Sequence, residues 1–265
     1  MWAALTLAAT LSLTPAQAGG LQLTNDRVTY GILGPVRTDK RFIPGDTLFL
    51  SFDIEGLKKE NGRLRYGMRM EFLDAKGRAK FTSNPEERDI IDVLGGTRVP
   101  LFAYAFLGLD AEPGEYTLRL TINDALGKQS KTLERKFEIA PRDFGLVGVN
   151  NTIGGSTPAA AVVVVGQPLV VNFGVAGFQR DAKTRQPSVK LEMTVLDESG
   201  KPTTTQSISE VVNKNVDEKI SILPGAFDLA LVRAGKFTVE LKATDQLQNK
   251  TSTVTLPLTI VEPPK

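Results

Sequence analysis

The chain has 265 residues, with 32 Lys and Arg against 30 Asp and Glu, and it contains neither His nor Cys. Charge is also balanced within each half, which argues against nucleic-acid binding, because proteins that neutralise a phosphate backbone carry a marked basic excess. The missing residue types exclude thiol catalysis, a Ser-His-Asp triad and Cys-ligated metals, so no cofactor is expected.

The N-terminal segment is typical of a secretory signal. An apolar run, Ala3 to Leu13, is followed by Pro15 and by Ala16-Gln17-Ala18, which fits an A-x-A cleavage site. No Lys or Arg precedes the run, so a buried N-terminal strand or helix is the alternative. Residues 1–18 are predicted to be a signal peptide, and the protein is expected to be secreted or periplasmic. No later segment reaches the roughly 20 apolar residues of a membrane span.

Alternating segments follow along the first half. Thr47 to Glu55 and Arg65 to Phe72 each alternate apolar and polar residues, which predicts half-buried strands. Ser83 to Asp92 is polar and acidic, and we expect a loop there with at most one helical turn. Val99 to Leu109 is apolar on both faces, with Phe102, Tyr104 and Phe106 on one of them.

The clearest strand pattern is Gly114 to Asp124, and it recurs as Gly235 to Asp245. In each copy four apolar residues share one face and polar residues share the other, a period of two that is typical of antiparallel strands. The two copies continue without a gap to Ala140 and Val261. The repeat is far too long for a solenoid unit and has the length of one β-sandwich.

The second half therefore repeats the plan of the first, and the boundary is predicted near Pro141. We expect two domains, residues 19–141 and residues 142–265. The segment Asn150 to Val165 has no counterpart of equal length in the first half, so a loop and an added or lengthened edge strand are expected there.

Around Gly114-Glu115-Tyr116 and its second copy, the sequence resembles bacterial immunoglobulin-like and fibronectin type III-like modules of exported proteins. The resemblance implies an all-β fold of two tandem immunoglobulin-like β-sandwiches. It also places Tyr116 at the tyrosine corner, where a hydroxyl ties back to the preceding loop. Phe237 stands at the same position in the second copy and lacks that hydroxyl.

Acidic residues suggest two kinds of chemistry, each with a simpler alternative. Glu86, Glu87, Asp89 and Asp92 form the densest carboxylate cluster, but catalysis needs a buried pair with separated pKa values, so a surface loop is favoured. Asp124 and Asp245 end their strands just before a turn. A calcium site is conceivable there, but hydrogen bonds to turn amides are the favoured role, and no metal is expected.

Two surfaces are candidate binding sites. Arg65, Arg69 and Arg119 point outward from neighbouring strands and would suit an acidic glycan or protein, unless interleaved acids neutralise them. The row Phe102, Tyr104 and Phe106 would bind a partner if uncovered, although the second domain or Ser83 to Asp92 is expected to cover it.

These features favour a non-catalytic, exported structural or protein-binding module at the cell envelope. A carbohydrate-binding protein is the alternative, and a two-domain periplasmic chaperone is a third. The chaperone hypothesis predicts an accessible strand edge near Leu133 to Ile139 and a basic cleft between the domains, although Arg135 argues against that edge. The expected partner is thus a protein or an envelope glycan, and no enzyme activity is expected.

Overall fold

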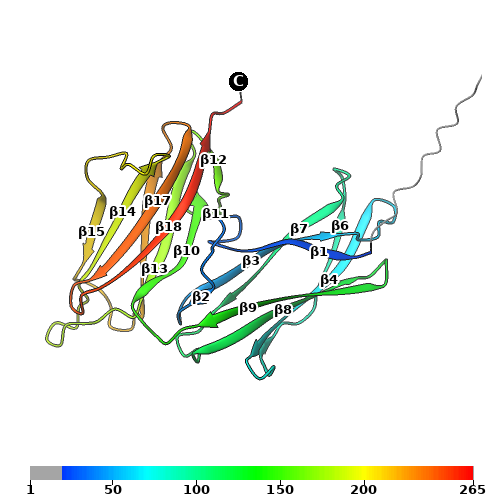
Figure 1. Cartoon of the computed structure of the whole chain (residues 1–265), viewed down its shortest axis with the longest axis horizontal. Coiled ribbons are helices and arrows are strands. Elements are labelled where there is room, and N and C mark those ends of the chain that lie inside the picture. Colours follow the sequence, from blue (N-terminus) through cyan, green and yellow to red (C-terminus); the bar gives the residue numbers. More distant parts are fainter. Residues whose placement is uncertain (1–19, 265) are drawn as a thin grey trace, which may run out of the picture.

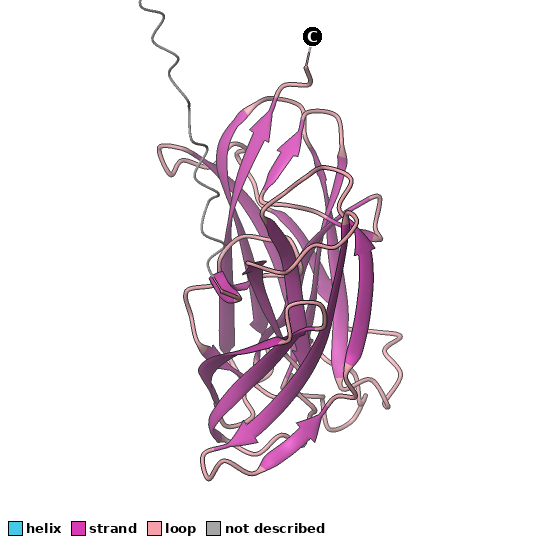
Figure 2. Ribbon diagram, turned by 90° about the vertical axis from the view of Figure 1, so that its right-hand side faces the viewer, coloured by secondary structure: helices cyan, strands magenta, loops and turns pink. Residues whose placement is uncertain are grey.

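The computed structural model describes residues 20–264, and the predicted signal peptide lies outside them. These residues form strands, turns and loops (Figures 1 and 2). The strands build two tandem immunoglobulin-like β-sandwiches, each made of two sheets around its own apolar core. The all-β prediction is therefore confirmed.

In the first sandwich, three antiparallel strands form one sheet in the order β1 (Gln22–Thr29), β3 (Thr47–Glu55) and β7 (Arg98–Phe106). The facing sheet runs β2 (Arg41–Phe42), β9 (Gln129–Ile139), β8 (Gly114–Asp124), β4 (Arg63–Asp74) and β5 (Ala79–Thr82), and β6 (Glu86–Ile91) also pairs with β4.

The second sandwich repeats the order of the main strands. One sheet runs β11 (Thr157–Pro158), β10 (Gly145–Ile153), β13 (Pro168–Ala176) and β16 (Ile222–Ala230). The other runs β12 (Val162–Val164), β18 (Lys250–Val261), β17 (Gly235–Asp245), β14 (Val189–Asp197) and β15 (Ile208–Val212). Its last strand, β15, pairs where β6 does in the first sandwich, at the start of its neighbour.

The two sandwiches also share their parallel edge pairs. In the first, β2 runs parallel to β9, and in the second β12 runs parallel to β18. The strand expected as an addition within Asn150 to Val165 is therefore the counterpart of β2, and only the loop and the two-residue β11 before it are extra.

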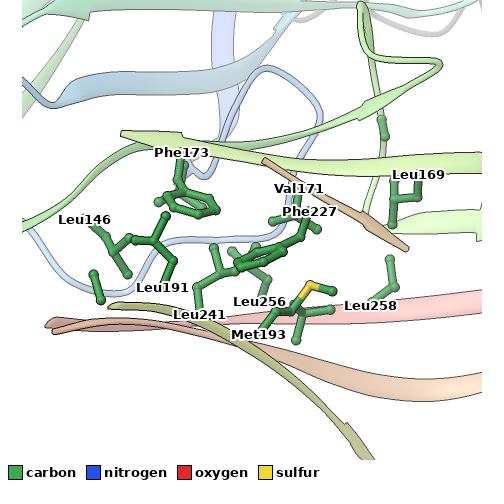
Figure 3. Packing of buried hydrophobic residues seen from close by; sticks show 14 of the residues in the cluster. Leu146, Leu169, Val171, Phe173, Leu191, Met193, Phe227, Leu241, Leu256 and Leu258 are labelled. Carbon is green, nitrogen blue, oxygen red and sulfur yellow. The ribbon is translucent and has the colours of Figure 1, made fainter. Parts of the chain in front are cut away.

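The alternating residues of the repeated strand fill the cores, as their period predicts. Leu118, Leu120 and Ile122 of β8 are fully buried, and so are Val239, Leu241 and Ala243 of β17. Figure 3 shows the second core, where side chains from both sheets point into the space between them.

The expectation of a loop at Ser83 to Asp92 is wrong, because β6 lies within it and pairs with β4 from Arg63 to Met68. β4 is long enough to pair with β6 along its first half and with β5 near its end. Ile90 packs against the core and anchors β6. The charged residues around Ile90 concealed this short alternation.

A buried carboxylate joins the two sandwiches. Asp46 in the first accepts a hydrogen bond from the Gly148 amide in the second at 2.8 Å. It also accepts one from Arg37 Nη1 at 2.7 Å, and the Arg37 guanidinium lies 4.0 Å from the centre of the Phe42 ring. One side chain thus connects both units at their junction.

Candidate binding surface

Strand β7 presents the aromatic row, Phe102, Tyr104 and Phe106, to solvent. Their exposed fractions are 40%, 56% and 61%. Neither the second sandwich nor Ser83 to Asp92 covers them, so the expectation of a cover is wrong. The physical reason is that β6, within Ser83 to Asp92, pairs with β4 and is therefore held in the opposite sheet instead of folding over the outer face of β7.

The row has a fourth aromatic neighbour on the adjacent strand. Phe49 of β3 is directly opposite Tyr104, with ring centres 6.0 Å apart and ring planes inclined by 33°. Ser51 and Thr47 lie opposite Phe102 and Phe106. The outer face of this sheet therefore carries a cluster of rings that needs no rearrangement to contact another molecule.

The free edge of β7 is the second feature of this surface. Leu107, just past the strand, donates to the Asp46 carbonyl at 2.9 Å and accepts from the Gly45 amide at 2.7 Å, so its backbone groups face β3. Successive residues of a strand point their backbone amide and carbonyl groups to opposite edges of the strand. The amide and carbonyl groups of Phe102, Tyr104 and Phe106 therefore face away from β3. β7 pairs with β3 alone within residues 20–264, so these groups are unpaired there.

A cleft of about 760 Å³ lies between this edge and the opposite sheet. Its walls are mostly apolar and come from β4, β5, β6 and β7. The residues that line it are Tyr66, Met68, Met70, Phe81, Ser83, Glu86, Arg88, Leu101, Phe102, Ala103 and Tyr104. Such a volume is within the range of ligand-binding pockets.

The cleft exists because β7 turns small residues inward. Ala103 is opposite Leu50, whereas Phe227 of the second sandwich is opposite Val171 at the equivalent place. At the next inward position, β7 carries Ala105 where β16 carries Leu229. In the second sandwich Phe227 and Met193 are both buried between the sheets, and there the core is filled (Figure 3).

The charged residues beside the cleft are already paired. Arg88 donates to Glu86 at 2.7 Å on the inner side of β6. Glu86 and Arg88 are the charged residues that line the cleft. Farther away, Arg98 at the start of β7 contacts Asp53 at 3.1 Å, and Lys80 of β5 contacts Glu112 at 3.4 Å. The surface therefore offers apolar contact and backbone groups, with little unpaired charge.

The three predicted arginines lie on the outer face of the other sheet, away from the aromatic row. Arg65 contacts Asp89 at 3.1 Å, and Arg69 contacts Glu71 at 3.4 Å. Arg119 contacts Glu134 at 2.6 Å, and this hydrogen bond raises the pKa of Arg119 above its ordinary value. Acidic neighbours thus pair with each arginine, which weakens the case for an anion-binding patch.

Asp124 and Asp245 tie turns together through backbone amides. Asp124 accepts hydrogen bonds from the Gly127 amide at 2.9 Å and, across the sandwich end, from the Lys58 amide at 2.9 Å. Asp245 accepts equivalent ones from the amides of Leu247 and Gln179, at 2.9 and 2.7 Å. This is the structural role that the sequence favoured.

The corner residues differ between the sandwiches. The Tyr116 hydroxyl donates to the Glu112 carbonyl at 2.9 Å, the geometry of a tyrosine corner. Phe237 makes no such bond, and the Arg233 guanidinium instead lies 5.1 Å from the centre of its ring.

The acidic cluster is divided between the two faces of β6. Glu86 faces the cleft, Asp89 pairs with Arg63 and Arg65 on the outer face, and Asp92 pairs with Lys59 beyond the strand. The hydrogen bond from Arg63 is the main reason that the pKa of Asp89 is lowered. Within residues 20–264, no group of three or more acidic side chains is placed to hold a metal ion.

Sequence reasoning found the aromatic row but missed the cleft beside it. The alternation of Arg65 to Phe72 predicted that Met68 and Met70 face inward, but not that they line an open cleft. The signal that could have revealed the cleft is the alignment of the two halves, which sets Ala103 against Phe227.

No described helix is long and apolar enough to cross a membrane.

No family model matches the chain, and a search of curated proteins finds no match. The distantly similar solved structures include the following two. A transglutaminase from red sea bream shares 9% identity and a TM-score of 0.29 over 92% of this chain, which spans 32% of the enzyme. The C-terminal domain of the Streptococcus agalactiae AgI/II polypeptide BspA shares 9% identity and a TM-score of 0.31, over 90% of this chain and 100% of that domain.

Proposed function

We propose that this chain is a non-catalytic, exported protein-binding module of the cell envelope, and that the first sandwich carries its binding surface. The observation that supports this most is the aromatic row on β7, which is more than a third exposed at every position and lies along a free sheet edge. Exposed apolar rows beside an open edge are expensive to leave uncovered, and they commonly mark interaction sites.

The second sandwich serves as an internal comparison for this proposal. At the same edge, β16 carries Ala226, Asp228 and Ala230 where β7 carries the three aromatic residues. A charge on an edge strand discourages pairing with other chains. The two units thus share a fold and differ in surface chemistry, with the adhesive surface confined to the first.

Photo-crosslinking in envelopes of the source organism tests the proposal. Phe106→benzoylphenylalanine is expected to give a discrete, light-dependent product that is lost when Phe102→Ser and Tyr104→Ser are added. The matched control is Ala230→benzoylphenylalanine at the equivalent edge of the second sandwich. Identical products from both positions, or none from position 106, would contradict the proposal.

Carbohydrate binding is the second candidate, and the packing of Phe49 against Tyr104 favours it because flat rings can stack on sugars. A glycan array probed with the purified chain separates the candidates. Binding to a defined glycan that Tyr104→Ser abolishes would favour carbohydrate over protein.

The chaperone alternative loses two of its expected features. The β9 edge near Leu133 to Ile139 is partly occupied, because Glu138 and Ile139 already pair with β2. Arg135 in the same strand pairs with Asp26. The cleft between the sandwiches contains Arg37, Arg41, Arg142 and Lys250, but also Asp39, Asp46 and Asp143, so it is not distinctly basic.

A further inference from the structure

We infer that the first sandwich binds an extended, uncharged segment of a partner protein, which adds to the free edge of β7 as a strand and inserts alternate side chains into the cleft. This inference rests on the proposed function and specifies its binding mode. Three observations support it: the backbone groups of β7, the shape of the cleft and the charges around it.

The backbone groups of β7 set the length and register of the added strand. Phe102, Tyr104 and Phe106 each offer an amide and a carbonyl on the free side. Pro100 on the same side has no amide, so the donor row begins at Phe102. A segment that bonds to both ends of this row needs about five residues in register, roughly 17 Å of strand.

The cleft provides the place for alternate side chains of that segment. A strand added to β7 would lie over β5 and β6, where Met70 and Phe81 form an apolar floor. The second sandwich fills the corresponding space itself. Phe227 occupies the core there, and Val216, in the loop before β16, packs against the same core.

Hydrogen bonds also anchor the loop between β15 and β16 in the second sandwich. In the first sandwich, the side chains of the equivalent loop between β6 and β7 point to solvent. Gln186 accepts from the Val216 amide at 2.9 Å, and Arg180 donates to the Ile220 carbonyl at 2.9 Å. In the first sandwich, Val93 and Leu94 of the equivalent loop are 82% and 93% exposed. The first sandwich thus has no counterpart of either Phe227 or Val216, the two side chains that fill the corresponding space between the sheets in the second.

Charge determines the chemistry of the segment. The charged side chains that line the cleft, Glu86 and Arg88, pair with each other, and the nearby charges of β5 and β7 form the pairs Lys80–Glu112 and Arg98–Asp53. An incoming Lys or Glu would therefore lose hydration without gaining an unpaired partner. The matching segment has no charge at its inward positions and carries large apolar residues there.

A second copy of this chain does not fit the same edge. Two identical antiparallel strands are related by a two-fold axis perpendicular to their sheet. Residues of β4, β5 and β6 line the cleft opposite β7, so a second copy paired at β7 would bring its own β5 and β6 toward the same space. The inferred occupant is therefore a single strand with no second sheet beneath it.

Selection from a library of random nine-residue peptides displayed on phage tests this inference. The wild-type chain is expected to enrich peptides with uncharged, large apolar residues at alternating positions. The best synthetic peptide should bind at least tenfold more weakly to Ala103→Phe, which places a ring where Phe227 lies in the other sandwich, and to Tyr104→Asp. Ala226→Asp, which puts the same charge on the β16 edge, should bind the peptide as the wild type does.

A second measurement separates strand pairing from simple contact with aromatic rings. N-methylation of the peptide at the amides that face β7 removes hydrogen bonds and keeps the side chains, and it should also weaken binding at least tenfold. Ala103→Phe is expected to keep or raise the Tm, and Tyr104→Asp serves if Ala103→Phe does not fold.

No enrichment over the Tyr104→Asp chain, or equal binding of the methylated peptide, would overturn the inference. Cross-links from position 106 in envelopes would in that case still support a protein-binding module that uses its aromatic face alone. Loss of both results would remove the proposed function as well.

Discussion

The two sandwiches repeat one strand order and differ most at a single edge. In the second, Phe227 fills the space between the sheets and Asp228 marks the strand edge with a charge. In the first, Ala103 leaves that space open and Tyr104 makes the edge aromatic. Large and small residues have exchanged faces on otherwise equivalent strands.

This exchange shows how a repeated fold can acquire a binding surface at low structural cost. The strands that form the repeat, β8 and β17, keep their buried residues, and so each core retains its centre. The change is confined to the last strand of the smaller sheet, where a missing side chain opens a cleft toward solvent instead of a void inside the core.

The largest expected effect comes from making the second sandwich resemble the first. Phe227→Ala removes a buried ring between Val171 and Met193 and is expected to cost about 3–5 kcal/mol of unfolding free energy. Three of the four tyrosines, Tyr66, Tyr104 and Tyr116, lie in the first sandwich, and the fourth, Tyr30, packs against the second core. Chemical denaturation followed by circular dichroism should therefore show an early second-sandwich transition, while most of the tyrosine fluorescence change stays at its original midpoint.

Ala230→Ser, at an exposed position on the same strand, is the control and should leave both transitions in place. A shift of the tyrosine signal as large as that of the dichroism signal would mean that the two units unfold together.

A shared feature should respond equally in both units. Asp124→Asn and Asp245→Asn each weaken a charged acceptor of turn amides and are each expected to cost about 2 kcal/mol. Asp124→Asn should lower the tyrosine-reported transition, and Asp245→Asn should lower the other. A calcium titration that stabilised the wild type through these residues would contradict their assignment as turn anchors.

A smaller effect is expected at the corner. Tyr116→Phe gives the first sandwich the residue type that Phe237 provides in the second, and it removes the hydrogen bond to Glu112. We expect a loss of about 1 kcal/mol, measured by urea denaturation. An unchanged midpoint would show that the ring alone, packed 5.2 Å from Phe72, stabilises the corner.

The fold was readable from the sequence wherever a strand buries one face. The alternation in Gly114 to Asp124 predicted the burial of Leu118 and Leu120, because half-buried strands impose a period of two. β6 was not readable, because its only core contact is Ile90 and charged residues occupy its other positions.

The binding surface was only partly readable for a different reason. The sequence showed that Val99 to Leu109 has two apolar faces, but which face meets the core depends on the register with β3. The cleft depends on the sizes of residues from two sheets, Ala103 and Met70, which are far apart in the chain. The partners of Asp124 and the cover of the aromatic row likewise depend on distant segments.

Acid should destabilise both sandwiches over the same range, and this is the smallest effect expected. Hydrogen bonds lower the pKa of Asp74, Asp89 and Asp92 in the first unit, and of Asp143, Asp181 and Asp197 further along the chain. The largest contribution comes from the Arg78 amide for Asp74, from Lys250 for Asp143 and from the Ser199 hydroxyl for Asp197. Each contributes stability above the unfolded value near 3.9, and loses it as the pH falls through its lower folded pKa. Because the chain has no His, stability should be nearly constant from about pH 6 to 8. Urea midpoints should thus fall together below about pH 4 in both signals, and a marked change near pH 6.5 would contradict this account.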